Sequence, residues 1–467
     1  MLNFGDTGEC QACLSKLESK INLFKTENGR SQLNECESLL NELSSIYESL
    51  IEFNGENKGS SIYRISIQIL TEGFRALRNA CAGCPQNQNL ISQREKVLEH
   101  IRTLFLSLVE KDYTEMKDLV LSCLCCGVQF LGNFVTGSEQ NQNIVWRFYL
   151  DLFNKFLSLE NEKLNSYTCM VIYNCSTEEH RSELITTDDG QVLIKGILQS
   201  LMKHDSEWGL YIIQDLLQYC GFMEDTFHVL NNSEKFFLLE IMKAKVKEFA
   251  ENEKETKLPF PVFCLSFILE QFKSKAHSIL GLNKQKTDDE SDSVVVVHLL
   301  DILCAATSRP SPYDKVKDDN DIVACCINLL KTVKDLGEQG CNEFTPVGKV
   351  ADLGSVNTEH PVHGLKRDLI RLVSNLVYKH KKNQNMVREL EGIPIILNHT
   401  NIDGRNPFIT QWCILAVRNL MDGNDDNKSY LNELKLEGVA NNPELMTQFG
   451  VNAMKKDDKI VVQKVLK

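Results

Sequence analysis

A spacing of paired asparagines that recurs along the chain is the feature that most constrains its fold. In four places an apolar helical pattern ends near an asparagine, and a second asparagine follows eight residues later. The four pairs are Asn79 and Asn87, Asn133 and Asn141, Asn375 and Asn383, and Asn419 and Asn427. A bulky apolar pair stands eleven and twelve residues after each first asparagine, as Tyr430-Leu431 does. Self-similarity at a fixed spacing is typical of stacked helical units, so the chain is predicted to be an all-α solenoid.

A fainter copy of the pattern lies at Asn174, where Ser182 occupies the place of the second asparagine. Neighbouring first asparagines are separated by 54, 41 and 44 residues for the pairs 79/133, 133/174 and 375/419. Armadillo and HEAT units repeat at roughly 40–47 residues, so two intervals fit and the longest implies an insertion. The repeats are therefore predicted to be armadillo-like.

The asparagines need a physical reason, because asparagine is a poor residue for a helix interior. The first asparagine of each pair is predicted to bond a neighbouring turn or a ligand, and the second to N-cap the next helix. Partner contacts are predicted at six residues: Asn79, Asn133, Asn375, Asn419, Arg78 and Arg418. The alternative, that these asparagines only bond neighbouring helices, stays open at this point.

Composition shifts divide the chain into three parts. Residues 1–336 are predicted to form N-terminal and middle armadillo-like repeats, with an acidic loop at 283–293. Residues 337–362 contain four glycines and are predicted to be a flexible loop. Residues 363–467 are predicted to form a C-terminal repeat domain with a short helix around Pro443–Phe449 in its tail.

The overall charge and the cysteine content restrict the partners and the compartment. The formal net charge is −13, which makes nucleic acid an improbable partner. No run approaches 18 consecutive apolar residues, so no membrane insertion is expected. The 17 cysteines and the absence of an obvious signal peptide suit a reducing compartment, so a cytoplasmic protein is expected.

The chain offers no pattern typical of an enzyme or a metal site. Its three Cys-x-x-Cys pairs lack the second pair or the histidines that a zinc site needs. Cys123 and Cys126 are predicted to be helix core, and Cys81 and Cys84 to lie in a turn without a metal. There is no phosphate-binding glycine loop and no Gly-x-Ser-x-Gly elbow. No catalytic residue, cofactor or metal is therefore predicted. Trp208 and Trp412 are expected in the core, whereas Trp146 suits either the core or an interface.

Several segments carry a resemblance to a known family. They are Phe74–Ala80 with Asn87, Gly127–Asn133, and Leu369–Tyr430 with its Asn406-Pro-Phe408 and Val417-Arg-Asn-Leu420. Together they resemble the ataxin-10 family of armadillo-repeat proteins, over nearly the whole chain. The resemblance implies a right-handed superhelix that self-associates as a homo-oligomer and binds partners without catalysis.

The same resemblance implies cellular roles and partners. These are cytokinesis, neuron survival and neurite outgrowth, with a G-protein beta subunit and the O-linked GlcNAc transferase as partners. The implied location is cytoplasmic and perinuclear, including the centrosome, the cilium base and the midbody. An alternative function is regulation of a GTPase, as in helical-repeat exchange factors; a third is a mainly structural role through self-association.

One comparison with another armadillo family argues against a nuclear-import adaptor. Those proteins place tryptophan four residues before the groove asparagine. Here the corresponding positions hold Arg75, Gln129, Met170, Arg371 and Leu415. The clamp for a basic peptide is therefore absent from the sequence.

Overall fold

The computed structural model describes residues 2–53, 61–110, 114–283, 290–319, 321–340, 342–348, 354, 356–434, 451–456 and 459–464. Almost all regular structure in these ranges is helical, which confirms the predicted all-α helical-repeat fold. The contacts divide the chain into two compact units, Met1–Leu230 and Asn231–Lys467. The three-part division expected from composition stays a prediction.

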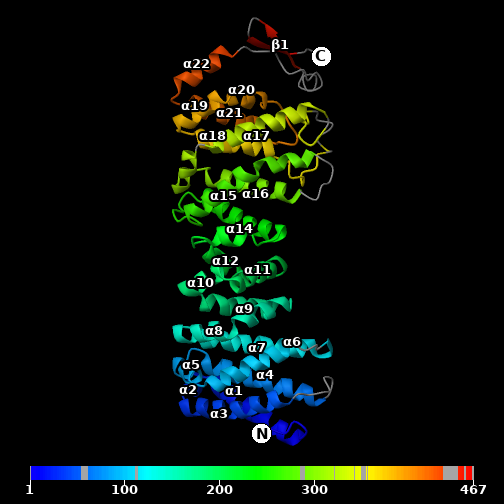
Figure 1. Cartoon of the computed structure of the whole chain (residues 1–467), viewed down its shortest axis with the longest axis vertical. Coiled ribbons are helices and arrows are strands. Elements are labelled where there is room, and N and C mark those ends of the chain that lie inside the picture. Colours follow the sequence, from blue (N-terminus) through cyan, green and yellow to red (C-terminus); the bar gives the residue numbers. More distant parts are fainter. Residues whose placement is uncertain are drawn as a thin grey trace. The chain divides into compact units, whose positions relative to one another are not determined.

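The first unit is built from helices that stack in two layers. Its elements are α1 (Thr7–Phe24), α2 (Glu27–Arg30), α3 (Leu33–Glu52), α4 (Ser61–Cys81), α5 (Pro85–Ser92), α6 (Glu95–Glu110), η1 (Thr114–Met116), α7 (Lys117–Val135), α8 (Glu139–Ser158), α9 (Glu162–Cys175), α10 (Glu178–Thr186), α11 (Asp188–Lys203), α12 (Glu207–Leu216) and α13 (Phe222–Phe227). Layer A contains α1, α4, α7, α9 and α12, each packed on the one before (Figure 1). Layer B contains α3, α6, α8 and α11, packed in the same successive way.

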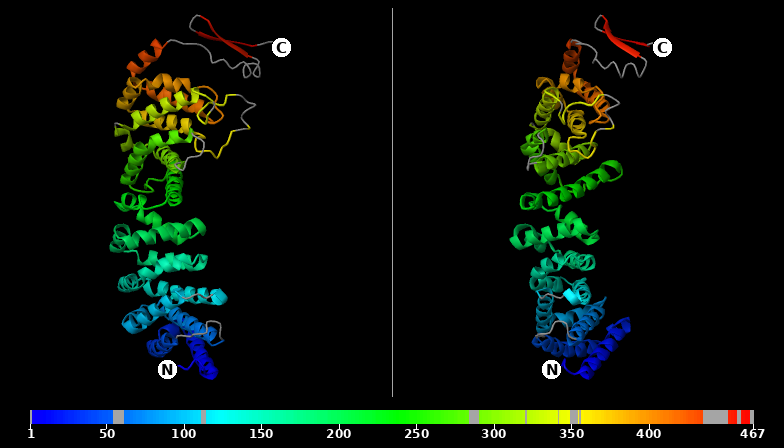
Figure 2. Two further views of the ribbon diagram at one scale, coloured as in Figure 1. Left: turned by 45° about the vertical axis from the view of Figure 1, so that its right-hand side comes forward. Right: turned by 90° about the vertical axis from the view of Figure 1, so that its right-hand side faces the viewer.

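The second unit is built from helices that stack in the same way. Its elements are α14 (Asn232–Glu251), α15 (Val262–Lys275), η2 (Ala276–Asn283), α16 (Glu290–Ala306), η3 (Pro312–Asp318), α17 (Asp321–Glu338), α18 (Leu365–Val377), α19 (Lys381–Glu389), α20 (Gly392–Asn398), α21 (Ile409–Met421), α22 (Asp425–Glu433), β1 (Val451–Lys456) and β2 (Lys459–Lys464). In this unit layer A contains α14, α16, α18 and α21, again in successive contact (Figure 2). β1 and β2 form an antiparallel hairpin in which Val451 pairs with Lys464. The helix expected around Pro443–Phe449 lies outside the described residues.

Local sequence signals explain where the helices begin. The Asp6 side chain accepts from two backbone N–H groups at the start of α1, and Ser138 does the same for one group at α8. Asn231 and Glu234 form a reciprocal capping box at α14. These side chains satisfy backbone donors that have no partner inside their helix.

The core between the layers is apolar and rich in aromatic rings. Phe74 of α4 stacks on Phe105 of α6 with centroids 5.2 Å apart, and Phe105 meets Phe156 of α8 edge-on at 5.3 Å. Among the described residues, α7 alone is long and apolar enough to cross a membrane. It packs between α4 and α9, where Phe130 and Phe134 are fully buried. Its apolar character thus serves contacts inside the unit.

Candidate functional site

The first asparagine of each pair joins two successive helices of layer A. In each case the side-chain Nδ2 donates to a backbone carbonyl of the preceding layer A helix. The acceptors are Ile21 O for Asn79 (3.3 Å), Arg78 O for Asn133 (2.9 Å), Cys304 O for Asn375 (3.2 Å) and Ser374 O for Asn419 (3.0 Å). Arg78 and Ser374 are themselves the residues just before Asn79 and Asn375. The bond therefore repeats in register from one repeat to the next.

The two predicted arginines differ in their surroundings. Arg78 is half-buried, and its Nη1 donates to Gln129 Oε1 of α7 (2.7 Å). Its Nε and Nη2 also donate to Asn79 Oδ1, at 3.3 and 3.2 Å. Arg418 is exposed on α21. The four asparagines and Arg78 thus have bonds within the fold, as in the structural alternative, and partner contact by the six residues stays a prediction.

The prediction that the second asparagine N-caps the following helix is wrong. Each second asparagine lies in the third helical position, and the N-cap residues are Cys84, Ser138, His380 and Asn424. Its Nδ2 donates instead to a carbonyl in the last turn of the preceding layer A helix, where carbonyls have no partner inside the helix. The bonds run from Asn87 to Ala80 (2.9 Å), Asn141 to Phe134 (2.9 Å), Asn383 to Leu376 (3.0 Å) and Asn427 to Leu420 (2.9 Å).

A glutamine that follows the second asparagine provides a link that sequence reasoning missed. Gln88 Nε2 donates to the carbonyls of Asn133 (2.7 Å) and Thr136 (3.2 Å) in the next repeat. Gln384 Nε2 reaches the equivalent carbonyls, at 2.9 and 3.1 Å. Asn133 and Asn419 therefore each make two links to the repeat before them. The side-chain Nδ2 donates to a carbonyl of that repeat, and the backbone carbonyl accepts from its glutamine. The signal was the dipeptide Asn-Gln, which occurs at the second asparagine in three of the four pairs.

The fainter repeat uses a histidine where the sequence suggested Ser182. His180 lies in the third position of α10, and its Nδ1 is 2.5 Å from the Cys175 carbonyl at the end of α9. Because a carbonyl only accepts, Nδ1 carries the proton. The ring stacks on Trp146 with centroids 4.4 Å apart. Trp146 is buried, which resolves its two alternatives in favour of the core.

The other two tryptophans are only half-buried, contrary to the expectation that they anchor the core. Trp208 lies against Tyr173 and Tyr211, two rings that are themselves exposed. Trp412 lies under the Arg371 guanidinium, with 5.3 Å between the guanidinium carbon and the ring centroid.

The cysteine pairs are helix core. Cys10, Cys13, Cys81, Cys84, Cys123 and Cys126 are all buried and free of disulfides. Burial raises the pKa of the Cys13 thiol to about 11 and that of Cys123 to about 12, which keeps both thiols protonated at neutral pH. In the described part of the chain no group of three or more His, Cys, Asp or Glu side chains could hold a metal ion.

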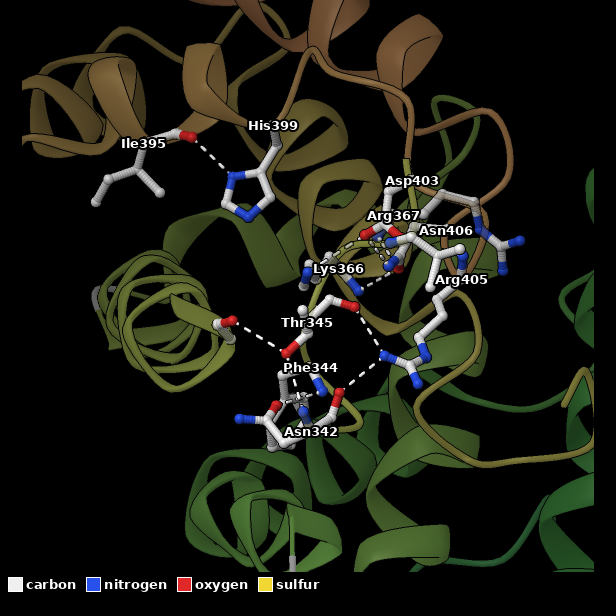
Figure 3. A network of polar contacts seen from close by, with 12 residues as sticks. Asn342, Phe344, Thr345, Lys366, Arg367, Ile395, His399, Asp403, Arg405 and Asn406 are labelled. Carbon is white, nitrogen blue, oxygen red and sulfur yellow. Dashed lines mark hydrogen bonds and ion pairs between the residues drawn. The ribbon is translucent and has the colours of Figure 1, made fainter. Parts of the chain in front are cut away.

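A buried polar network fixes the turn that leads into α21 (Figure 3). Lys366 Nζ pairs with Asp403 Oδ2 at 3.3 Å, and both side chains are almost fully buried. Asn406 Nδ2 donates to the same carboxylate (2.8 Å), while its Oδ1 accepts from the backbone N–H of Lys366 (2.9 Å) and Arg367 (3.2 Å). Burial lowers the pKa of Lys366, and the Asp403 carboxylate opposes that shift. Asn406 thereby caps α18 and holds the turn in place.

The same network holds part of the segment expected to be a flexible loop. Arg405 Nη1 donates to the carbonyls of Asn342 (2.8 Å) and Thr345 (2.7 Å), as Figure 3 shows. The backbone N–H of Val347 donates to Asp403 Oδ1 at 3.1 Å. Phe344, between these contacts, is fully buried. Residues 342–347 are therefore tied to the turn before α21.

Beyond this turn, α21 presents an exposed apolar face. Phe408, its N-cap residue, is 70% exposed and has a left-handed φ of +66°. Ile414 is 63% exposed. Gln411 and Arg418 are also exposed, and their spacing from Ile414 places all three on one side of the helix.

The exposure of Ile414 departs from every other copy of the repeat. Five residues before the first asparagine, the other repeats place Phe74, Val128, Cys169 and Ile370, and each of these side chains is fully buried. Ile414 occupies the same position relative to Asn419. α21 is the last layer A helix in the described part of the chain. Its free face is thus a stacking position that no later helix of the described residues covers.

The stacked layers and their repeated amide bonds define the class: the chain is an all-α helical-repeat protein. Residues 365–463 match the family model described as the spinocerebellar ataxia type 10 protein domain. Ataxin-10 of Homo sapiens is 32% identical over 403 residues, covering 85% of this chain and 82% of the relative. Ataxin-10 of Xenopus tropicalis is 30% identical, covering 86% and 81%. The chain belongs to the ataxin-10 family, which confirms the resemblance seen in the sequence.

Two further comparisons are a relative that matches a short stretch and a solved structure of low sequence identity. An ataxin-10 homolog of Dictyostelium discoideum is 48% identical over 89 residues, 19% of this chain and 15% of the relative. An engineered protein of solved structure aligns over 86% of this chain and 98% of its own at 11% identity, with a TM-score of 0.25.

Proposed function

We propose that the chain is a non-catalytic scaffold that binds partner proteins and self-associates through the free face of α21. The observation that supports this proposal is the exposure of Ile414 at a position that the other repeats bury. Exposed apolar groups with a polar rim are typical of protein-interaction sites. Gln411 and Arg418 supply such a rim on the same helix.

Phe408 adds a second apolar group to this surface. A left-handed backbone costs a residue with a Cβ about 1–2 kcal/mol. The equivalent N-cap of α18 is Gly364, at a φ of +84°, which carries no such cost. Packing of the Phe408 ring within the turn does not offset this backbone strain, because most of the side chain is in solvent. Burial against another molecule would contribute about 1.5–3 kcal/mol for each of Phe408 and Ile414.

A second copy of the chain is the occupant that best fits this face. Layer A helices already stack on one another within each unit, so α21 of another molecule offers a matching surface. A contact between two α21 helices would be isologous, with the same residues contributed by each copy.

Light scattering of the full chain and of two variants tests the proposal. Ile414→Asp places a charge on the free face and is expected to lower the mass to that of a monomer. Met202→Asp is the matched control, since Met202 is an exposed apolar residue of the first unit. An Ile414→Asp protein that keeps the mass of the unaltered chain contradicts self-association through α21.

Family membership supports finer proposals about the cell. These are roles in cytokinesis and in neuron survival and neurite outgrowth, and location in the cytoplasm, around the nucleus, at the centrosome or cilium base and at the midbody. The proposed partners are a G-protein beta subunit and the O-linked GlcNAc transferase. Crosslinking and capture from cells tests this set. Acceleration of nucleotide release from a purified G protein would instead favour a regulator of GTPases.

A further inference from the structure

The first unit contains a cavity that the proposed self-association does not involve. It has a volume of about 340 Å³ and is bounded by α8, the start of α9 and α11. Small-molecule sites in proteins have volumes of roughly 300–1,000 Å³, so the cavity is large enough for a small ligand. Leu157 and Val192 give it apolar walls, and the remaining lining is polar.

Two of the lining residues are almost completely buried and keep a polar atom without a partner. Asn165 is 1% exposed and Ser200 is 3% exposed. Neither Asn165 Oδ1 nor Ser200 Oγ has a hydrogen-bond partner within the described ranges. Asn165 Nδ2 is held by the Leu157 carbonyl at 3.3 Å, which leaves its Oδ1 as an acceptor. Buried polar atoms are nearly always paired, so these two indicate a missing hydrogen-bond partner.

The charges around the cavity favour an anion. Lys195, Gln199 and Lys203 line it at intervals of four residues, on one side of α11. Lys203 pairs with Glu160. Lys195 is half-buried and forms no ion pair with a carboxylate in the part of the chain that the structure describes. The cavity therefore holds one ammonium group available to an acid.

A glycine inside α11 leaves room at the wall. A Cβ on Gly196 would lie 3.3 Å from Leu157 Cδ1 and 3.5 Å from Asn154 Oδ1. Glycine in a helix interior is unfavourable compared with alanine. At this position it allows α8 to approach α11 and keeps the cavity free of a methyl group.

We propose that this cavity binds a small organic anion that also carries hydroxyl groups, such as the phosphate ester of a polyol. The acid group accepts hydrogen bonds from Lys195, and a hydroxyl donates to Asn165 Oδ1. Ser200 Oγ both donates and accepts, so it can bond either part of the ligand. The carbon skeleton lies against Leu157 and Val192.

Isothermal titration calorimetry of the full chain tests this site with three probes: glycerol 3-phosphate, inorganic phosphate and glycerol. Glycerol 3-phosphate is expected to bind more tightly than either fragment. Lys195→Met is expected to weaken its binding at least about tenfold, as for the loss of a hydrogen bond to a charged group. Lys16→Met, at an exposed lysine of α1, is the matched control and is expected to bind as the unaltered chain does.

Gly196→Ala separates loss of the site from loss of the fold. The substitution favours the helix but places a methyl group in the cavity wall, so binding is expected to weaken while the helical circular dichroism signal stays unchanged. The proposal is overturned if glycerol 3-phosphate gives no binding heat at millimolar concentration. It is equally overturned if Lys195→Met and Gly196→Ala bind the ester as tightly as the unaltered chain, since the cavity would then hold only water. Neither result bears on self-association through α21.

Discussion

Replacing Gln384 with methionine tests whether side-chain amides hold successive repeats together. Gln384 is 1% exposed, and its Nε2 donates to the carbonyls of Val377 (3.3 Å), Asn419 (2.9 Å) and Asp422 (3.1 Å). Methionine keeps the volume and removes the donor, so no large cavity forms. A buried carbonyl left without a partner costs about 1–3 kcal/mol. The Asp422 carbonyl is only partly buried, so water can replace that hydrogen bond in the variant. We therefore expect the local unfolding free energy of α21 to fall by about 2–3 kcal/mol.

Native-state hydrogen exchange measures this loss where it occurs, because repeats open locally. Amides of α21 are expected to exchange roughly 30- to 150-fold faster in Gln384→Met, since each 1.4 kcal/mol is a factor of ten. Gln142→Met is the matched control: Gln142 follows the second asparagine of another repeat, is half-buried and makes a single longer bond, of 3.4 Å, to the Val135 carbonyl. Equal effects of the two substitutions would refute an inter-repeat role for the glutamine amide.

Three further predictions concern single positions. Phe408→Gly relieves a left-handed backbone and is expected to stabilise the second unit by about 1 kcal/mol in thermal unfolding while weakening self-association. Burial lowers the pKa of His399, so as the pH falls the unfolded chain binds a proton at this side chain before the folded chain does. The unfolding free energy is therefore expected to decrease as the pH falls below about 6.5, and to decrease less steeply in His399→Gln. Gly127→Ala would bring a Cβ to 2.4 Å from Phe105, and a loss of about 1–3 kcal/mol is expected in urea unfolding.

The repeat architecture could be predicted from the sequence because helical periodicity and asparagine spacing are local patterns. The partner of each asparagine could not. A side chain in the third position of a helix can donate to an unpaired carbonyl at the end of the preceding helix. The sequence position alone does not distinguish such a residue from an N-cap residue. Asn383 shows the point: its Nδ2 bonds Leu376 O and also Lys317 O, which is 66 residues away.

The candidate surface was only partly visible in the sequence. The sequence predicts a partner contact at Arg418, which lies on the free face. In the same apolar helical pattern, Ile414 looks like one more core residue. Its exposure depends on which helices pack against α21, and within the described ranges no later layer A helix does so. The strain at Phe408 was hidden for a similar reason, since the turn is fixed by the pairing of its Asp403 with Lys366, which is 37 residues away in the sequence.

Site-specific photocrosslinking tests self-association through α21 most directly. A benzoylphenylalanine placed at position 414 of the full chain would lie on the free face, and one at position 202 serves as the control. The expected result is a covalent dimer from position 414 alone, with the crosslinked peptide mapping to Ile409–Met421 of the second copy. A chain that forms no dimer from position 414, or one that crosslinks elsewhere, would contradict the proposed interface.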